Sequence, residues 1–317
     1  MTASTIVAVT GATGFFGRHL VAALAREGAH LRVLARHPPP PDMWPGLTPE
    51  IVPGSLEQPD ALERLADGAD AVIHAAGVVA ARSRAAFLQA NRDGAQAAAA
   101  AASRQTPTAR FILISSLAAR APGLSDYAAS KRAGEEAVRT VYKNGPERLV
   151  ILRPPALYGP GDRATLALFQ AAARPLVPVF GSGRAAIMHA EDAAAAVARL
   201  AMGAGDGGLY SLADTNPGGY HIADILAEAA HAANRNPHFV RLPDAALLAA
   251  GLAADWWGRL YGGTPIFTIG KAREMLHPDW SVTPDELLPL SVYRAKIGIA
   301  EGFRDTVAWY RQAGWLR

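Results

Sequence analysis

The sequence predicts an α/β protein: a doubly wound parallel sheet followed by a smaller mixed α/β lobe. Three observations lead to this prediction. Short apolar runs alternate with amphipathic helical segments through the first half of the chain. A glycine-rich turn joins the first apolar run to the first helix. The chain has 317 residues and 50% of them are hydrophobic, which is enough to bury a large core.

The first predicted strand is the run IVAVT at 6–10, whose β-branched residues are typical of a strand buried on both faces. The turn GATGFFG follows, and a helix then runs to about Gly28, where a helix C-terminal glycine is expected. Strand, glycine-rich turn and helix in this order indicate a dinucleotide site. We expect Gly11 to permit the tight turn, Gly14 to let backbone N–H groups approach a pyrophosphate, and Gly17 to let the helix pack against the strand.

The second predicted strand, 31–36, ends in Arg36, and His37 follows it. An NAD site usually has an acidic residue here, which accepts hydrogen bonds from the ribose hydroxyls. A guanidinium cannot accept those bonds, but it pairs well with a 2′-phosphate. The sequence therefore favours NADP(H) over NAD(H), with Arg18 and Arg32 as further candidates for the phosphate. The alternative is that Arg36 is a solvated surface residue, in which case NAD(H) could also bind.

Four more strands, with helices between them, complete the predicted sheet. The strands are 50–56, 70–77, 110–116 and 149–153, and the helices are 59–67, 85–104 and 125–139. The strand at 70–77 ends in small residues, which would let a flat cofactor lie against the backbone. Ligands bind such sheets at the carboxyl ends of the strands. We therefore expect the glycine turn, Ser116, Tyr127 and Pro154 to meet at that edge.

Tyr127 and Lys131 lie four residues apart on the helix 125–139 and so share one face of it. A phenol with its ordinary pKa of about 10 is a poor proton donor and a poor base at neutral pH. A fixed ammonium beside it favours the phenolate and lowers that pKa. The pair is therefore suited to general acid–base chemistry on an alcohol or a ketone, although chance alone produces this spacing in many helices.

Beyond Asp162 the pattern changes to the smaller mixed lobe. The predicted helices are 164–173, 192–202, 222–233, 244–254 and 303–312, and the strands are 177–180, 209–213 and 239–241. We divide the chain into a cofactor domain at 1–162, with return segments at about 185–215, and a substrate lobe at 163–317.

The lobe also contains an apolar set with few charges among its members. This set is Leu247, Leu248, Leu252, Trp256, Trp257, Leu260, Tyr261, Ile266 and Phe267. We expect most of these side chains to form the core of the lobe. The two tryptophans lie beside Asp255 and Arg259, so they could instead border an apolar cleft or contact membrane lipid.

Composition excludes several classes of function. The chain has no cysteine, which excludes disulfides, thiolate catalysis and Cys-ligated metal, and we expect no metal site. The formal charge is only +3 and the cations are scattered, so we expect no nucleic-acid partner. No signal peptide pattern is visible, and the apolar stretch 245–254 is shorter than the roughly 20 residues that span a bilayer. We expect a cytoplasmic protein without a transmembrane segment.

Taken together, these motifs resemble the extended short-chain dehydrogenase/reductases, also called the NAD-dependent epimerase/dehydratase family. The resemblance covers nearly the whole chain. It is carried by TGATGFFG (10–17), HAAG (74–77), Asn91, ISS (114–116), Tyr127 with Lys131, LRPPALYGPGD (152–162), HAED (189–192) and EGFRDTVAWYRQAGWL (301–316). The resemblance implies a Rossmann-type fold and, by default, a homodimer.

Carried over by position, the resemblance implies that Tyr127 is the acid/base and that Lys131 is its electrostatic partner and a ribose contact. Ser116 would hydrogen-bond the reacting oxygen. In such enzymes Asn91 is usually structural or part of a proton relay, and His189 and Asp192 would be structural. The residues expected at the cofactor are Gly11, Thr13, Gly14, Phe15, Phe16, Gly17, Arg36, Ser55, Leu56, Ala75, Ala76, Gly77, Asn91, Ser115, Lys131, Pro154, Ala156 and Leu157.

Three departures from the family pattern bear on function. Arg36 replaces the NAD-type carboxylate, and Ser55 stands where many members have an Asp that contacts adenine. Ala156 stands where many nucleotide-sugar members carry an Asn. The short connection between Ser116 and Tyr127 leaves little room for the substrate loop of those enzymes. The last two features argue against a sugar-nucleotide epimerase.

We therefore expect an NADP(H)-dependent oxidoreductase that interconverts a secondary alcohol and a ketone. The substrate would be a small hydrophobic carbonyl compound, of the lipid, sphingoid, steroid or flavonoid kind, and the nearest relatives would be hydroxysteroid- and dihydroflavonol-type reductases. One alternative is a nucleotide-sugar epimerase or dehydratase with tightly bound cofactor. A second alternative is a non-catalytic cofactor-binding subunit, although such proteins are expected to lose Tyr127 or Lys131.

Overall fold

The computed structural model of the chain describes residues 5–261 and 267–316. Within them, seven strands form one parallel sheet in the order β11-β6-β5-β4-β1-β2-β3. The strands are β1 (Ile6–Thr10), β2 (His30–Ala35), β3 (Glu50–Pro53), β4 (Ala71–His74), β5 (Arg110–Ile114), β6 (Leu149–Arg153) and β11 (Gly208–Ser211). The strand order reverses at β1, which lies between β2 and β4. This reversal is the point where doubly wound sheets bind their ligands, and the predicted fold class is confirmed.

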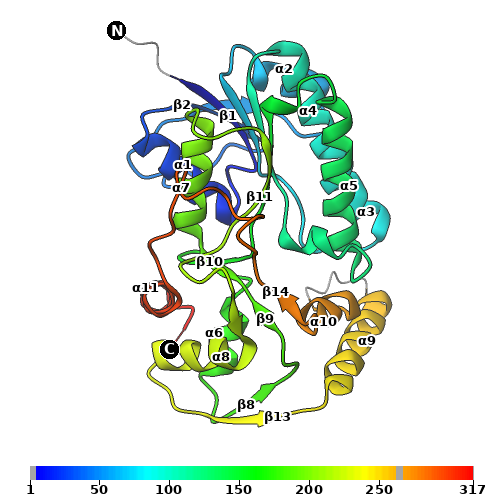
Figure 1. Cartoon of the computed structure of the whole chain (residues 1–317), viewed down its shortest axis with the longest axis vertical. Coiled ribbons are helices and arrows are strands. Elements are labelled where there is room, and N and C mark those ends of the chain that lie inside the picture. Colours follow the sequence, from blue (N-terminus) through cyan, green and yellow to red (C-terminus); the bar gives the residue numbers. More distant parts are fainter. Residues whose placement is uncertain (1–4, 262–266, 317) are drawn as a thin grey trace. The chain divides into compact units, whose positions relative to one another are not determined.

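Helices cover both faces of the sheet (Figure 1). On one face lie α2 (Pro59–Ala66), α4 (Gly94–Gln105) and α5 (Asp126–Val141), and on the other lie α1 (Phe15–Arg26) and α7 (Ala190–Ala201). The first three pack on the sheet through a fully apolar cluster that includes Leu62, Phe111, Val138 and Ile151. Five of the seven alanines of α4 are buried in this cluster, so the alanine-rich segment is a closely packed helix.

The helix predicted at 85–104 is divided by a wider turn. α3 (Arg84–Leu88) passes into a π-helical turn at Gln89–Asp93 before α4 begins. Such turns insert an extra residue into the helix and are common near functional sites. Here the turn contains Asn91, whose side chain is buried.

The described residues fall into two compact units. The first comprises the described residues up to Arg153 together with Ala193–Ser211 and Leu288–Arg294. The second comprises the described parts of Pro154–Asp192, Leu212–Leu287 and Ala295–Arg317. The segment predicted as a strand at 209–213 is β11, and it joins the main sheet beside β6.

The second unit is built around an aromatic core. The helices α6 (Leu166–Ala172), α8 (Ile222–Ala232) and α11 (Ile299–Gln312) surround Tyr158, Phe169, Phe303 and Tyr310. The Phe303 ring meets those of Tyr158 and Phe169 edge to face, with centroids 4.8 and 4.9 Å apart. The unit's short strands are β7 (Ala156–Tyr158), β8 (Leu176–Val179), β9 (Arg184–Ala185), β10 (Ile187–His189), β12 (Tyr220–His221), β13 (His238–Arg241) and β14 (Asp279–Trp280). Most of these strands were too short to predict from the sequence.

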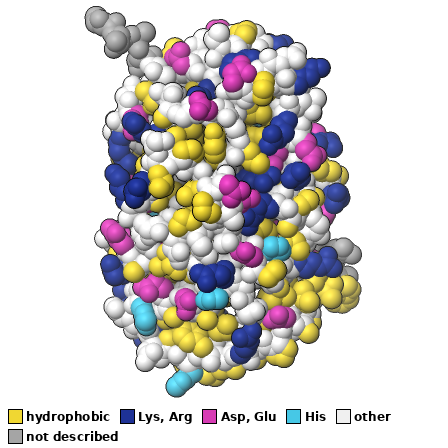
Figure 2. All heavy atoms as spheres, in the orientation of Figure 1, with side chains coloured by type: hydrophobic (Ala, Val, Ile, Leu, Met, Phe, Trp, Pro, Cys, Tyr) yellow, Lys and Arg dark blue, Asp and Glu magenta, His cyan; other side chains and the backbone are white. Residues whose placement is uncertain are grey.

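The helix α9 (Asp244–Tyr261) is longer than the predicted 244–254, and α10 (Ile269–Met275) packs against it. The expectation that most of the apolar set would be core is wrong for the side chains that the structure describes, and the tryptophans follow the alternative of an exposed position. Leu247 is buried, but Leu252, Trp256 and Trp257 are 58%, 63% and 60% exposed. Figure 2 shows hydrophobic side chains gathered where Figure 1 places these two helices. Ile266 and the side chains of Arg259, Leu260 and Tyr261 lie outside the described residues.

Candidate active site

The glycine turn after β1 has the backbone geometry that was predicted for it. Gly11 has φ +75°, and a Cβ atom there would lie 2.5 Å from the backbone nitrogen of Ala76. A Cβ atom on Gly17 would overlap the carbonyl oxygen of Gly11, so the first turn of α1 lies directly on the glycine turn. Both positions therefore exclude any side chain, the first for conformational reasons as well.

The start of α1 offers backbone N–H groups to a ligand. Gly14 is the N-cap residue and provides no side-chain hydrogen bond, and both Thr13 and Gly14 are exposed. The first N–H groups of a helix have no partner within it, and they carry the positive end of the helix dipole. A glycine turn at an uncapped helix N-terminus fits the diphosphate of a dinucleotide.

Replacing Gly17 by Ala should damage this turn. The added methyl group overlaps the backbone of Gly11, so we expect a loss of about 1–3 kcal/mol of stability and weaker binding of the dinucleotide cofactor. Gly123→Ala is the control, because a Cβ atom there meets nothing within 4 Å. Thermal unfolding and cofactor titration measure both effects. Equal affinity in the two variants would contradict the close packing.

The carboxyl end of β4 lies beside that of β1. Thr10 Oγ1 and His74 Nδ1 are 3.0 Å apart, and both side chains are buried. Burial, with a smaller contribution from the charge of Lys131, lowers the pKa of His74 to about 3. His74 is therefore a neutral, packed strand residue, as predicted. The small residues Ala75, Ala76 and Gly77 follow it and are partly or fully exposed.

Asn91 connects this segment to α5. Its side-chain nitrogen donates hydrogen bonds to the Val78 carbonyl at 3.0 Å and to Ser130 Oγ at 2.8 Å, and its oxygen accepts one from the Val78 N–H at 2.9 Å. The side chain is 3% exposed. Of the two roles expected for Asn91, these contacts favour the structural one.

Tyr127 lies in the first turn of α5, whose start is capped as predicted. Ser125 is the N-cap, and its hydroxyl accepts a hydrogen bond from the Ala128 N–H at 2.9 Å. The Tyr127 ring is partly exposed and packs against Phe87 of α3, with centroids 6.3 Å apart. The cap and the ring contact together hold the phenol at the beginning of the helix.

Lys131 ties α5 to the end of β5. Its Nζ donates a hydrogen bond to the Ile114 carbonyl at 2.7 Å. Burial lowers the pKa of Lys131 to about 8, and the carboxylate of Glu135 opposes this shift. A Cβ atom on Gly77 would lie 3.9 Å from Nζ, so the ammonium also lies close to the end of the β4 segment. The carboxyl-end segments of β4 and β5 therefore lie close to α5 around the Lys131 ammonium.

Ser116 follows Ile114 by two residues and is partly exposed. Its Oγ accepts a hydrogen bond from the Ala118 N–H at 3.2 Å and caps the short 3₁₀ helix Leu117–Arg120. A hydroxyl that accepts a bond still has its own proton to donate. The side chain is therefore oriented and can hydrogen-bond a carbonyl oxygen.

The neighbouring Ser115 belongs to a buried ionic network. Its hydroxyl donates to Glu135 Oε1 at 2.6 Å, and Arg153 donates to both carboxylate oxygens, at 2.8 and 2.6 Å. All three residues are at least 94% buried. The network joins the ends of β5 and β6 to α5 one turn beyond Lys131. Two features of the sequence could have indicated this network: Glu135 lies four residues after Lys131, and Arg153 ends an apolar strand.

Arg36 follows β2 directly and is exposed. It lies near Glu57: the hydrogen bond from Ser55 is the largest cause of the lowered pKa of Glu57, and the charge of Arg36 contributes less. Arg32 is instead bound to Glu50 at 3.0 Å and to the Asp67 carbonyl at 2.6 Å. The interpretation of Arg32 as a phosphate contact is therefore wrong.

The predicted cofactor residues Phe15, Phe16 and Leu56 lie in the first unit and are partly exposed. Three others, Pro154, Ala156 and Leu157, lie in the second unit. Pro154 follows β6 and is buried, whereas Ala156 is exposed on β7 and pairs with Ile187 of β10. Asp192 accepts hydrogen bonds from the backbone N–H groups of Lys296 and Ile297, both at 2.8 Å. These bonds give Asp192 the structural role that was expected.

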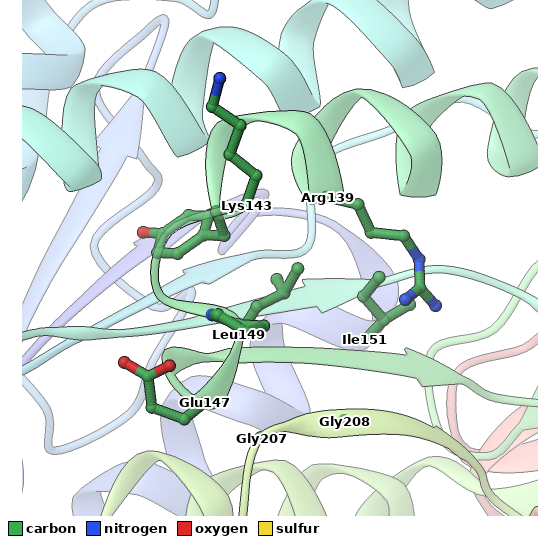
Figure 3. Close-up of a pocket in the computed structure, with 9 residues that line it drawn as sticks. Arg139, Lys143, Glu147, Leu149, Ile151, Gly207 and Gly208 are labelled. Carbon is green, nitrogen blue, oxygen red and sulfur yellow. The ribbon is translucent and has the colours of Figure 1, made fainter.

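A pocket of about 440 Å³ lies elsewhere in the first unit (Figure 3). Its lining includes Arg139 in the last turn of α5, Lys143 just beyond that helix, Leu149 at the start of β6 and Gly208 at the start of β11. It therefore opens at the amino ends of the strands. None of the predicted site residues lines it.

The chain is similar to known proteins over most of its length. Residues 7–213 match the NAD dependent epimerase/dehydratase family. A ceramide reductase of Caulobacter vibrioides is 49% identical over 313 residues, which cover 98% of this chain and 96% of the relative. A 2'-dehydrokanamycin reductase of Streptomyces kanamyceticus is 31% identical over 217 residues, which cover 61% of this chain and 57% of the relative.

Solved structures with the same fold are more distant in sequence. The crystal structure of gox2253 superposes with a TM-score of 0.79 at 22% identity, covering 99% of this chain and 100% of that one. The UDP-glucose 4-epimerase of Thermus thermophilus, in complex with NAD, has a TM-score of 0.71 at 22% identity, covering 98% and 100% of the two chains. Such identities show a shared fold alone.

Proposed function

The chain belongs to the NAD dependent epimerase/dehydratase family of extended short-chain dehydrogenase/reductases, close to its reductases, and we propose that it reduces a long-chain lipid ketone with NADPH. It is an NAD(P)-dependent oxidoreductase. The observation that carries the lipid substrate is the 49% identity to a ceramide reductase over nearly the whole length of both chains. Ceramide is an N-acylated long-chain base, so a ketone of sphingoid type is the substrate class that we infer.

When bound, NADPH supplies a hydride to the carbonyl carbon. Ser116 donates a hydrogen bond to the carbonyl oxygen and orients it. Tyr127 delivers the proton that this oxygen needs, so that the ketone becomes a secondary alcohol. Lys131, held by the Ile114 carbonyl, stabilises the phenolate that remains. The direction of the reaction follows from the reductase relatives.

We further propose that the cofactor diphosphate lies on the glycine turn. Thr13, Gly14 and the first N–H groups of α1 are exposed there and can bind it. The small residues 75–77 leave room for the ribose beside Lys131. Further contacts with the cofactor remain predictions, and they involve Phe15, Phe16, Ser55, Leu56, Pro154, Ala156 and Leu157. Asn91 and Ser115 act by positioning, because both side chains are buried and bound to protein atoms.

The preference for NADPH is proposed to come from Arg36. Replacing Arg36 by Asp removes the guanidinium from the 2′-phosphate, so we expect NADPH to bind about 10- to 100-fold more weakly, with little change for NADH. Arg26→Asp is the control, because it makes the same charge change at the far end of α1. Titration with both cofactors measures the ratio. An unchanged ratio in Arg36→Asp would contradict this assignment.

The proposed activity is tested by adding a long-chain β-keto lipid in detergent micelles and NADPH to the purified protein. We expect NADPH consumption and one alcohol formed per NADPH. Cofactor that stays bound through purification, with turnover of a nucleotide sugar and no added NADPH, would instead identify an epimerase. The homodimer stays a prediction, which sedimentation analysis can check.

A further inference from the structure

The helix α9 has an apolar face that the rest of the second unit leaves uncovered. After Asp244, the exposed side chains that the structure describes on this helix are all alanine, leucine or tryptophan: Ala245, Ala246, Ala249, Ala250, Leu252, Ala253, Trp256 and Trp257. They recur at intervals of three and four residues, so they form one continuous stripe along the helix. An amphipathic helix normally turns polar residues to water, and here the exposed side is the apolar one.

The acidic side chains of α9 are engaged with their own unit. Asp244 Oδ1 accepts a hydrogen bond from the Gly181 N–H at 2.8 Å, and Asp255 Oδ2 accepts one from the Ile269 N–H at 3.1 Å. Several of the exposed side chains that flank the helix are cationic. Arg241 lies shortly before the start of α9 at Asp244, and Lys271 and Arg273 lie on α10, which packs against α9. Lys271 also pairs with Glu274 at 3.1 Å. The surroundings of the apolar stripe therefore complement a negatively charged surface.

Two residues of the stripe are tryptophans, a residue type suited to the boundary between lipid and water. Its ring buries a large apolar area while its N–H keeps a polar contact, which is why tryptophans gather at the boundary between lipid and water. Two adjacent tryptophans, with exposed fractions of 63% and 60%, are the last members of the stripe among the described side chains. Within the described residues, no helix is long and apolar enough to cross a bilayer. The pattern instead fits a helix that lies in the plane of the lipid surface.

We propose that α9 docks the protein on the surface of an anionic phospholipid bilayer. The apolar stripe enters the boundary between headgroups and acyl chains, and the flanking cations contact the lipid phosphates. This proposal rests on the proposed function, because a lipid ketone resides in the bilayer and the enzyme must reach it there. The vesicle-binding test of this proposal depends on the exposed residues of α9 and is independent of ketone reduction.

Vesicle flotation tests the proposal with the full-length protein. We expect binding to vesicles that contain phosphatidylglycerol, weaker binding to vesicles of phosphatidylcholine alone, and weakening as salt is raised. The double variant Trp256→Ser/Trp257→Ser should lose binding by at least about tenfold. Leu290→Ser is the control, since Leu290 is 53% exposed but lies in the first unit, and it should bind as the original protein does.

Two further measurements separate the outcomes. Cofactor affinity and reduction of a short, water-soluble ketone should be unchanged in the double variant, which shows that it is folded. If the double variant does not fold, Leu252→Ser gives the same test with a smaller change. Absence of vesicle binding by the original protein overturns the docking proposal but leaves ketone reduction intact, whereas vesicle binding without ketone reduction overturns only the proposed function. A dimer that the tryptophan variant converts to a monomer, without vesicle binding, would assign the face to a second copy of the chain.

Discussion

Tyr127→Phe is expected to lower kcat by about 100- to 10,000-fold while leaving NADPH affinity near its original value. The substitution removes only the phenolic oxygen, so the ring contact with Phe87 and the cap of α5 stay in place. What is lost is the proton that the carbonyl oxygen must receive as the hydride arrives. Steady-state rates and NADPH titration measure the two quantities separately.

The matched control for this variant is Tyr210→Phe. Tyr210 lies on β11, and its hydroxyl contacts the backbone carbonyls of Asp206 and Gly207, both at 3.4 Å. Its removal should leave the rate unchanged. Turnover by Tyr127→Phe equal to that of this control would show that another group supplies the proton.

Glu135→Ala is expected to destabilise the protein by about 3–5 kcal/mol, because the buried guanidinium of Arg153 then has no counter-charge. The same change removes the acceptor of the Ser115 hydroxyl and the anion that opposes the lowered pKa of Lys131. Activity should fall as well, since these groups join β5, β6 and α5 at the proposed site. Thermal and denaturant unfolding measure the first effect.

The adjacent Glu136 provides an internal control. It is exposed and pairs with Arg132 on the same helix, so Glu136→Ala should change stability by less than about 1 kcal/mol. Replacing Glu135 and Arg153 together with leucine should recover much of the lost stability, since no unpaired charge is then left inside. If Glu135→Ala and Glu136→Ala change the free energy of unfolding by the same amount, the buried pair of Glu135 and Arg153 contributes nothing to stability.

The parts of the site that could be predicted are those encoded by local sequence pattern. Gly11 must adopt a positive φ, and Tyr127 and Lys131 share a helix face by their spacing alone. Continuous apolar runs such as 149–153 identify buried parallel strands without knowledge of their neighbours. These features depend on residues within one or two turns of each other.

The parts that escaped prediction depend on contacts between segments distant in sequence. The buried pair of Glu135 and Arg153 joins residues 18 apart, and the pattern of neither segment reveals the other. Arg32 could be assigned only when its bonds to Glu50 and Asp67 were visible. The sequence of α9 favours burial because apolar residues are usually buried, and it leaves open whether Trp256 and Trp257 are exposed. Its exposure is a property of the tertiary arrangement alone.

The proposed ketone reduction depends on the transfer of hydride from the cofactor to the ketone, with Tyr127 as the proton donor. The most direct test is to supply NADPH that carries deuterium at the transferable C4 position, together with a long-chain β-keto lipid, and to analyse the product by mass spectrometry. The proposed mechanism predicts one deuterium on the carbinol carbon of each alcohol formed, and at least about 100-fold slower formation of this labelled alcohol when Tyr127 is Phe. A rearranged or dehydrated product without label, or no product, would contradict it.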